Sequence, residues 1–245
     1  MNDASARALN ALNQRFYADS AAEFAATRSA PWPGWRNLVP LLRAGSHPGI
    51  LDVGCGNGRF ASFLSAALHA PFLYCGIDAS APLLALAERA LADLPGARLV
   101  HADLVLEGLD SVLAAEQRFD CVAVFGLLHH IPGESRRRAL LRALAERVAP
   151  GGFLALTFWD FAQEPRFEGK IVRTAPPELA DGLEPGDVLL RWGEAKSPPR
   201  LRYCHHADEA EEARLLADLP LVPRLAYASD GRGGRLNRYR ILERC

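Results

Sequence analysis

The sequence predicts an α/β protein with a doubly wound, mostly parallel sheet and an antiparallel hairpin at one edge of that sheet. Short apolar runs alternate with amphipathic helical segments between residues 49 and 159, and the connections between them are short. The run FDCVAVF at 119–125 is almost wholly apolar, as expected for a strand buried on both faces. Beyond residue 220, two strand-like runs flank the turn DGRGG at 230–234, which is typical of a hairpin.

Each element follows from its own local pattern. Strands are expected where apolar runs end in glycine, proline or polar residues, at 49–53, 72–77, 97–101, 119–125 and 153–159. Helices are expected where apolar residues recur at helical spacing, at 1–30 together with a short arm, 35–43, 59–68, 80–94 and 134–148. Ser80 can cap the helix that starts beside it. The hairpin strands are expected at 221–228 and 235–242.

Composition narrows the class of protein. With 245 residues, 49% of them hydrophobic, the chain can bury a large core, and its net charge of -1 gives no global signal for nucleic acid or membranes. No run approaches the roughly 20 apolar residues of a membrane span, and the N-terminus lacks the layout of a signal peptide. The five cysteines show no paired spacing, so we expect reduced thiols in a cytoplasmic protein.

The first expected strand ends in the glycine-rich sequence LDVGCGNG at 51–58. Glycines at such a turn let a ligand approach the backbone, and the next helix points its N-terminus at that ligand. Asp78 ends the second strand, where a carboxylate can accept hydrogen bonds from ribose hydroxyls. Asp52 would repel a pyrophosphate but suits a cationic amino acid, and the spacing is GxGxG rather than GxGxxG. These features favour S-adenosylmethionine (SAM) over a dinucleotide.

The expected cofactor contacts come from the ends of several strands. Asp103 could accept a hydrogen bond from an adenine amino group, with Leu104 as a backbone donor, or it could merely cap the backbone at Val105. The residues expected to bind the cofactor are Asp52, Gly54, Cys55, Gly56, Asn57, Gly58, Asp78, Ala79, Asp103, Leu104 and Phe125.

Residues 52–58, Asp78, Asp103 and the turn PGG at 150–152 resemble the class I SAM-dependent methyltransferases over about residues 45–160. The resemblance implies a Rossmann-like fold with SAM as the cofactor. We expect one domain over 1–245, made of an N-terminal helical arm (1–44), a cofactor-binding core (45–160), a substrate-side insertion (161–200), and a C-terminal helix and hairpin (201–245). The insertion has little periodicity and holds six of the 17 prolines, which predicts a long loop.

Three further segments resemble the tRNA wobble-uridine carboxymethyl methyltransferases, a family that includes the methyltransferase domain fused to the AlkB-like tRNA hydroxylase. The segments are FAATRSAPWP at 24–33, DVLLRW at 187–192 and RYCH at 202–205. Two departures leave the substrate open. Arg191 stands where the family usually has proline, and Cys204 stands where it usually has a second aromatic residue.

The resemblance implies esterification of a carboxylate on a modified uridine. Such a carboxylate is ionised at neutral pH, so no general base is required and the enzyme must mainly orient it. Arg28, which we prefer, or Arg202 could bind it bidentately, and Arg28 could instead hold the carboxylate of SAM. Asp187, Trp192 and Tyr203 are carried over from the resemblance as substrate-side residues. Trp192 could stack on a splayed base or anchor the long loop.

Paired histidines and grouped arginines are less specific signals. His129 follows the fourth strand, where it could contact the substrate or merely line the cleft, and His130 is expected to be packed. Because the histidines occur as adjacent pairs, no metal site is predicted. The arginines at 136–138 and in the last 22 residues either contact RNA or form a solvated face.

The family resemblance also implies two partners, the tRNA anticodon loop and a small zinc-binding protein. Two other functions stay open. A small-molecule O- or N-methyltransferase would need no basic surface, and the departure at Cys204 favours it. A non-catalytic SAM-binding or RNA-binding subunit is the third reading, and the intact glycine turn with both carboxylates speaks against it.

Overall fold

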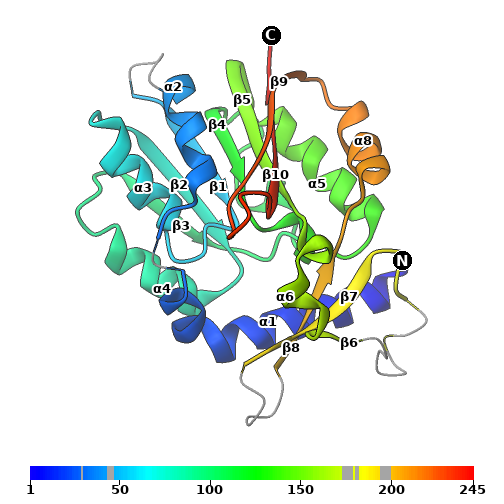
Figure 1. Cartoon of the computed structure of the whole chain (residues 1–245). Helices are drawn as coiled ribbons and strands as arrows, with labels where there is room; N and C mark the ends of the chain where they lie inside the picture. The colour runs from blue at the N-terminus through cyan, green and yellow to red at the C-terminus, as the bar shows by residue number, and fades with distance from the viewer. Residues whose placement is uncertain (29, 43–46, 173–178, 180–181, 194–199) are drawn as a thin grey trace.

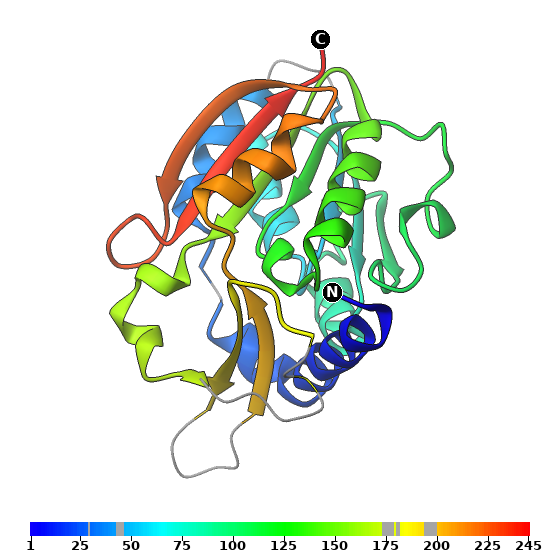
Figure 2. The same ribbon diagram turned by 90° about the vertical axis from the view of Figure 1, so that its right-hand side faces the viewer.

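Two sheets organise the molecule, a central seven-stranded sheet and a smaller three-stranded antiparallel sheet below the ends of its strands (Figures 1 and 2). The computed structural model describes residues 1–28, 30–42, 47–172, 179, 182–193 and 200–245. The expected boundary at residue 44 lies outside these residues, as do parts of the expected insertion.

The central sheet has the strand order β3-β2-β1-β4-β5-β10-β9. Its strands are β1 (Gly49–Val53), β2 (Leu73–Asp78), β3 (Ala97–His101), β4 (Phe119–Val124), β5 (Val148–Trp159), β9 (Val222–Ser229) and β10 (Asn237–Glu243). Strands β1 to β5 pair in parallel, whereas β10 pairs antiparallel with both β5 and β9. The predicted parallel sheet with an antiparallel hairpin at one edge is therefore confirmed.

Helices cover both faces of this sheet, as Figure 2 shows. The helices of the described chain include α1 (Asp3–Ala26), α2 (Val39–Leu42), α3 (Arg59–Leu68), α4 (Ala81–Ala90), α5 (Glu134–Glu146), α6 (Pro165–Glu168) and α8 (Glu209–Ala217). Leu141 of α5 and Leu215 of α8 belong to one buried cluster, and Leu64 of α3 and Leu84 of α4 belong to the cluster on the other face. The alternation seen in the sequence thus arises because each crossover helix buries its apolar stripe against the sheet.

Some element boundaries differ from expectation, because buried apolar residues continue beyond the end of a regular helix or pairing begins before the expected strand. Helix α4 starts after its predicted cap Ser80, whose side chain accepts a hydrogen bond from the Leu83 amide, but it ends at Ala90. Leu91 has left helical geometry (φ -110°, ψ 12°) yet is buried, so the apolar pattern continued past the helix. Strand β5 begins at Val148, before the predicted start at residue 153, because Val148 already pairs with Phe119.

The smaller sheet corrects the prediction that residues 161–200 form a long loop. It contains β6 (Ile171–Val172), β7 (Asp187–Trp192) and β8 (Arg200–His205), and the expected boundary between residues 200 and 201 cuts through β8. These short strands are stabilised by packing rather than by a strong local pattern, since Leu189 and Tyr203 bury against Leu9 of α1. Among the described residues, the helices are all too short or too polar to cross a membrane.

Candidate functional site

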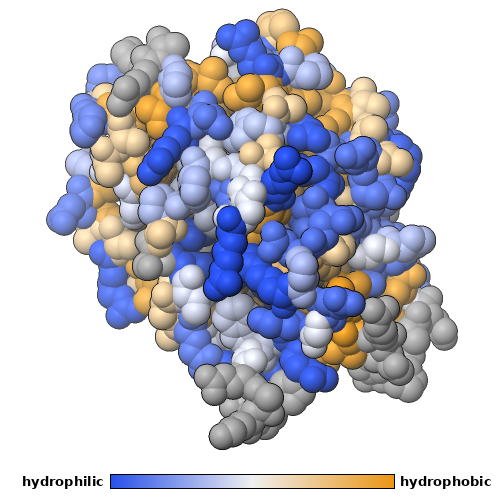
Figure 3. Space-filling view, in the orientation of Figure 1, coloured by the Kyte–Doolittle hydropathy of each residue, from blue (hydrophilic) through white to orange (hydrophobic). Residues whose placement is uncertain are grey.

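A cavity of about 640 Å³ opens at the carboxyl ends of the parallel strands. Asp52 of β1, Asp78 of β2, Phe125 after β4 and Trp159 of β5 all line it, and α1 closes it from below with residues such as Tyr17. This is where ligands bind in doubly wound sheets. Figure 3 shows that hydrophilic side chains gather over the middle of the face seen in Figure 1, where α6 and the turn between β9 and β10 lie.

One end of the cavity, which we call the glycine end, is formed by Asp52, Gly54, Gly56 and Asp78. Gly54 has φ +78° and donates its amide to the Ile77 carbonyl at 2.8 Å. A Cβ on Gly54 would come within 3.0 Å of Leu127, so the turn needs glycine there for both conformation and space. The predicted cofactor residues Cys55, Asn57, Ala79, Asp103, Leu104 and Phe125 line the cavity as well.

Gly58, from the predicted cofactor set, does not line the cavity, and its contact with a cofactor stays a prediction. It lies at the N-cap of α3 with φ +75°, and a Cβ there would meet Leu91 at 3.0 Å and Ala87 at 3.2 Å. The sequence motif therefore contains one glycine that serves close packing between α3 and α4 rather than access for a ligand.

Two carboxylates shape the glycine end. The Asp78 carboxylate accepts hydrogen bonds from the amides of Gly56 and Ser80, both at 2.8 Å, so it is fixed against the turn. Asp52 is 2% exposed, and burial raises the pKa of its carboxyl to about 7, although a hydrogen bond at 2.7 Å from the Tyr74 hydroxyl opposes the shift. A buried carboxylate of this kind favours a cationic ligand, which would restore its charged form.

Asp103 behaves as the capping alternative predicts. One carboxylate oxygen accepts the Val105 amide at 3.0 Å, and the other accepts the side-chain amides of Asn10 and Gln14. These bonds attach α1 to the wall of the cavity beside Leu104. The structure therefore assigns Asp103 first to anchoring α1, and contact with a cofactor's adenine amino group stays a prediction.

A second part of the cavity wall, which we call the arginine end, is formed by Arg28, Arg202, Trp159 and Trp192. The Arg28 guanidinium carbon lies 3.5 Å from the ring centroid of Phe24 and 5.3 Å from that of Trp192. The Arg202 guanidinium carbon lies 5.2 Å from the Trp159 centroid and 5.6 Å from the Trp192 centroid. The two predicted arginines, which are far apart in sequence, thus lie near the same aromatic ring, that of Trp192.

Within the described part of the chain, neither of these arginines forms an ion pair with a carboxylate. The hydrogen bonds of Arg28 go to the Thr27 hydroxyl at 2.9 Å and the Phe24 carbonyl at 3.5 Å. Burial, followed by the charge of Arg202, lowers the pKa of Arg28 to about 10, so the side chain stays cationic at neutral pH. Arg202 is only 4% exposed. Two poorly solvated guanidinium groups side by side form a site for an anion.

His130 is held by hydrogen bonds on both ring nitrogens, in agreement with the prediction that it is packed. The Tyr17 hydroxyl lies 2.8 Å from Nε2, and Nδ1 lies 2.9 Å from the Tyr203 carbonyl oxygen. Burial lowers the pKa of His130 to about 3, so the ring is neutral, donates from Nδ1 and accepts at Nε2. His129 lines the cavity, and its buried Nδ1 has no hydrogen-bond partner among the described residues.

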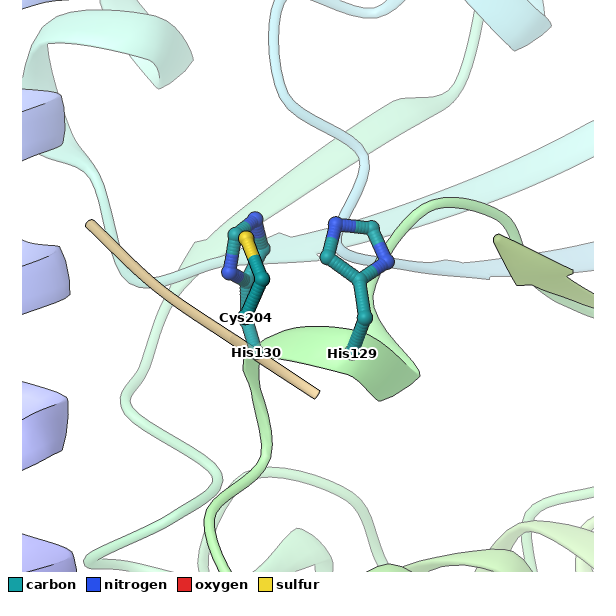
Figure 4. A group of neighbouring side chains, drawn as sticks. All are labelled: His129, His130 and Cys204. Atoms are coloured by element: carbon teal, nitrogen blue, oxygen red, sulfur yellow. The ribbon is translucent and has the colours of Figure 1, made fainter. Parts of the chain in front are cut away.

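His129, His130 and Cys204 offer metal-ligand atoms within 4.8 Å of one another (Figure 4). Adjacent histidines gave no such signal in the sequence, because Cys204 comes from β8. The donor set fits a metal ion poorly. Both nitrogens of His130 are already engaged, burial raises the pKa of the Cys204 thiol to about 11, and the Arg202 charge acts on all three side chains.

Asp187 and Tyr203, from the predicted substrate-side set, do not line the cavity, and their contact with a substrate stays a prediction. Successive side chains of a strand point to opposite faces. Arg202 therefore faces the cavity while Tyr203 faces α1, where its hydroxyl donates to Asp187 at 2.7 Å. The predicted Arg28, His129, Trp192 and Arg202 do line the cavity.

Several lining residues were missed by reasoning from the sequence. They lie on α1, and a signal for them exists in the spacing of Asn10, Asn13, Gln14, Tyr17 and Phe24. This stripe at intervals of three, four and seven residues is polar at first and aromatic later, so it does not look like an ordinary apolar face. Trp159 was also missed, although it ends a predicted strand. Arg166, Phe167 and Lys170 were missed because they lie in or just after the short helix α6, where only a loop was expected.

Comparisons with known proteins agree with this geometry. Residues 51–154 match the model of a methyltransferase domain. The tRNA (carboxymethyluridine(34)-5-O)-methyltransferase of Arabidopsis thaliana is 32% identical over 150 residues, which cover 61% of this chain and 33% of that protein. The corresponding methyltransferase alkbh8 of Xenopus tropicalis is 30% identical, over 61% of this chain and 21% of its own length. The chain thus spans a third or less of these curated relatives.

Solved structures match over nearly the whole chain. The CcbJ methyltransferase from Streptomyces caelestis has a TM-score of 0.65 at 18% identity and covers 96% of this chain and 99% of its own. The N-methyltransferase NodS from Bradyrhizobium japonicum, in complex with S-adenosyl-L-homocysteine, has a TM-score of 0.60 at 15% identity and covers 99% of both chains. Over residues 51–154 the chain thus resembles SAM-dependent methyltransferase domains, and its similarity to curated relatives points to the tRNA carboxymethyluridine methyltransferases.

Proposed function

We propose that this protein uses SAM to esterify the carboxylate of a carboxymethylated wobble uridine in tRNA. The observation that carries the proposal is the arginine end of the cavity, where Arg28 and Arg202 lie without a carboxylate partner among the described residues. A planar guanidinium can bind an acceptor carboxylate with two parallel hydrogen bonds. The surrounding tryptophans suit a planar base that has left its stack.

The glycine end of the same cavity fits SAM. Asp78 is fixed where it could accept the ribose hydroxyls, and Asp52 offers a buried carboxylate to the cationic amino acid portion. Gly56 leaves the backbone open at this turn, since no atom beyond the adjacent residues lies within 4 Å of the position that a Cβ would take there. When bound, SAM supplies an electrophilic methyl group on a sulfonium.

The residues of this chain then act by orientation and charge. Arg202 and Arg28 hold the acceptor carboxylate and exclude water from it, while Trp192 covers one side of the same space. Proton transfer is not required, since the attacking carboxylate is already ionised at neutral pH and the ester forms without loss of a proton. Neutral His129 and His130 fit this chemistry, because neither is poised as a base near pH 7.

Partners and location belong to the same proposal. The anticodon loop of tRNA would present the modified uridine, and the compartment would be the cytoplasm. A small zinc-binding protein would assist by covering exposed apolar strand surface; the edge strand β9 exposes Val222 by 47% and Leu225 by 40%. The arginines at 136–138 do not form an open RNA patch, because they pair with acidic residues including Asp3, Glu211 and Asp218.

The proposal is tested by methyl transfer from labelled SAM to total tRNA that contains carboxymethyluridine, with and without the small zinc-binding protein. The RNA is then digested to nucleosides. The expected product is an alkali-labile methyl ester of the wobble uridine. Labelling of a small molecule instead of RNA would show that the acceptor is not tRNA. SAM binding without any methyl transfer would favour a non-catalytic SAM-binding subunit.

A further inference from the structure

Strand β8 separates two sets of side chains. Arg202 and Cys204 face the cavity side, where Cys204 packs with Phe161 and Leu190. Tyr203 and His205 face the other way, because side chains alternate along a strand. A slip of one residue in the pairing of β8 with β7 would exchange the two sets and remove Arg202 from the cavity. The register of β8 therefore decides whether the site is formed.

A chain of buried charged groups fixes that register. His205 lies directly opposite Asp187 in the pairing of β8 with β7, and its Nδ1 is 2.6 Å from the Asp187 carboxylate. Its Nε2 is 2.7 Å from a carboxylate oxygen of Glu211 on α8. The His205 and Asp187 side chains are 1% and 0% exposed, and that of Glu211 is 8% exposed. Two carboxylates are acceptors only, so the ring between them must donate from both nitrogens and carry a positive charge.

The bridge continues into the loop that carries the paired histidines. Arg137 of α5, 1% exposed, pairs with the other Glu211 oxygen at 2.7 Å and donates to the Ile131 carbonyl at 2.9 Å. Beyond it, β8 is bonded on the opposite side: the Tyr203 amide donates to Asn13 of α1 at 2.8 Å. Strand β8 is thus bonded to β7 and α8 through His205 and to α1 through Tyr203, and α5 joins this set through Glu211.

We propose that Asp187, His205 and Glu211 form a buried carboxylate–imidazolium–carboxylate bridge that holds the register of β8 and so positions Arg202 in the arginine end of the cavity. In this assignment His205 is a positioning residue and touches no substrate. The assignment rests on the proposed function only in naming what Arg202 binds. The bridge also gives Asp187 and Tyr203 a role that does not require them to contact the substrate.

The charge states give the bridge a pH window. Burial lowers the pKa of His205, but its hydrogen bonds to Asp187 and Glu211 outweigh burial, so the pKa ends above its ordinary value of 6.5. For Glu211, burial raises the pKa, but His205 and Arg137 outweigh it, so the pKa ends below 4.5. The other groups facing the bridge are Arg137, Glu184 and Tyr203. The stabilisation is full between about 4.5 and 6.5 and is lost as pH rises through the folded pKa of His205.

The first measurement needs no variant and no substrate. In the wild-type protein, long-range ¹H–¹⁵N spectra of the imidazoles are followed over pH together with the Nε–Hε resonance of Arg202. We expect the His205 ring to remain doubly protonated above pH 6.5, and the Arg202 resonance to shift or broaden over the same pH range in which His205 loses its proton. A His205 ring that titrates near pH 6.5 overturns the proposal, as does an Arg202 resonance that does not change while His205 loses its proton.

The second measurement uses His205→Gln with the matched control His206→Gln. His206 is the neighbouring histidine, and it bonds a single carboxylate, Asp160, at 2.8 Å. In His205→Gln we expect kcat/KM for the modified tRNA to fall about ten- to hundredfold, as small misplacements of a positioning group do. The Kd of His205→Gln for SAM should change by less than about twofold. His206→Gln should behave as wild type.

A further variant, Glu211→Gln, keeps an oxygen that can accept from His205 but removes the charge. We expect it to lower the pH at which His205 loses its proton and to move the Arg202 resonance change to the same lower pH. Equal losses of SAM and acceptor binding in His205→Gln would show a general folding defect and overturn the positioning role. If wild-type protein methylates no RNA, the proposed function fails, and the spectra still decide whether the bridge positions Arg202.

Discussion

Replacing Arg202 with methionine separates a functional arginine from a structural one. Methionine keeps an unbranched side chain of similar length and removes the charge. Arg202 is 4% exposed, and three aromatic rings, those of Phe16, Trp159 and Trp192, lie 5.2 to 5.6 Å from its guanidinium carbon. With no carboxylate partner in the described chain, its charge is buried among aromatic rings and has no opposite charge beside it until an anion binds.

The magnitude follows from two charge-assisted hydrogen bonds to the acceptor carboxylate. At about 1.5–3 kcal/mol each, and allowing for non-additivity, their loss should cost about 3–4 kcal/mol in the transition state. That corresponds to a fall in kcat/KM of roughly two to three orders of magnitude. The free energy of unfolding of Arg202→Met should rise or stay unchanged, since a buried unpaired charge is replaced by an apolar group.

The assay is methyl transfer to modified tRNA at several substrate concentrations, with thermal unfolding of both proteins measured in parallel. Arg202→Lys serves as the charge-preserving comparison and should recover part of the activity, because it keeps the charge but not the planar fork. A Tm for Arg202→Met that is lower by more than about 5 °C, equivalent to well over 1 kcal/mol at this chain length, would show that Arg202 holds the fold rather than the acceptor.

Three further predictions concern the cofactor. Burial raises the pKa of Asp52 to about 7, and a cationic ligand needs the ionised carboxylate, so the Kd for SAM measured by calorimetry should rise about tenfold for each pH unit below 7 and stay constant above pH 7. Asp52→Asn should abolish this pH dependence, and an unchanged dependence in the variant would assign the titration to another group. Asp78→Asn should weaken SAM about tenfold or more, while Asp120→Asn, an exposed acceptor for the Gly49 amide, should not; similar Kd values for the two variants would refute the ribose contact. Arg28→Met should lower kcat more than it weakens SAM binding, and equal losses would move Arg28 to the carboxylate of SAM.

Much of the central sheet could be predicted because its signals are local. The glycine turn, the cap at Ser80 and the almost wholly apolar β4 each define an element without knowledge of the rest of the chain. The glycine end was predictable for the same reason, since parallel strands bring their carboxyl ends together at one edge. Gly58 shows the limit of such a motif, because the packing of Leu91 against Gly58 depends on the tertiary structure and cannot be seen in the local sequence.

The smaller sheet could not be predicted because its stability is not local. Strand β7 gains its order from α1, more than 150 residues earlier in the chain, and from the bridge through His205 to α8. The same reason explains why the sequence did not show that Asp187 and Tyr203 lie outside the cavity wall. Motif residues adjacent in sequence point to opposite faces of a strand, and only the strand assignment shows which of them reach the cavity.

The most direct test of the central claim compares two anticodon stem-loops that differ in one group at the wobble uridine, a carboxymethyl group in one and its neutral isostere, a carbamoylmethyl group, in the other. Binding is measured with wild-type protein and with Arg202→Met in the presence of S-adenosylhomocysteine. The account predicts that wild-type protein prefers the carboxylate by roughly 30-fold or more, in line with about 2 kcal/mol for a charge-assisted contact, and that Arg202→Met loses the preference. Equal binding of the two stem-loops by wild-type protein would contradict the claim that the paired arginines receive a carboxylate.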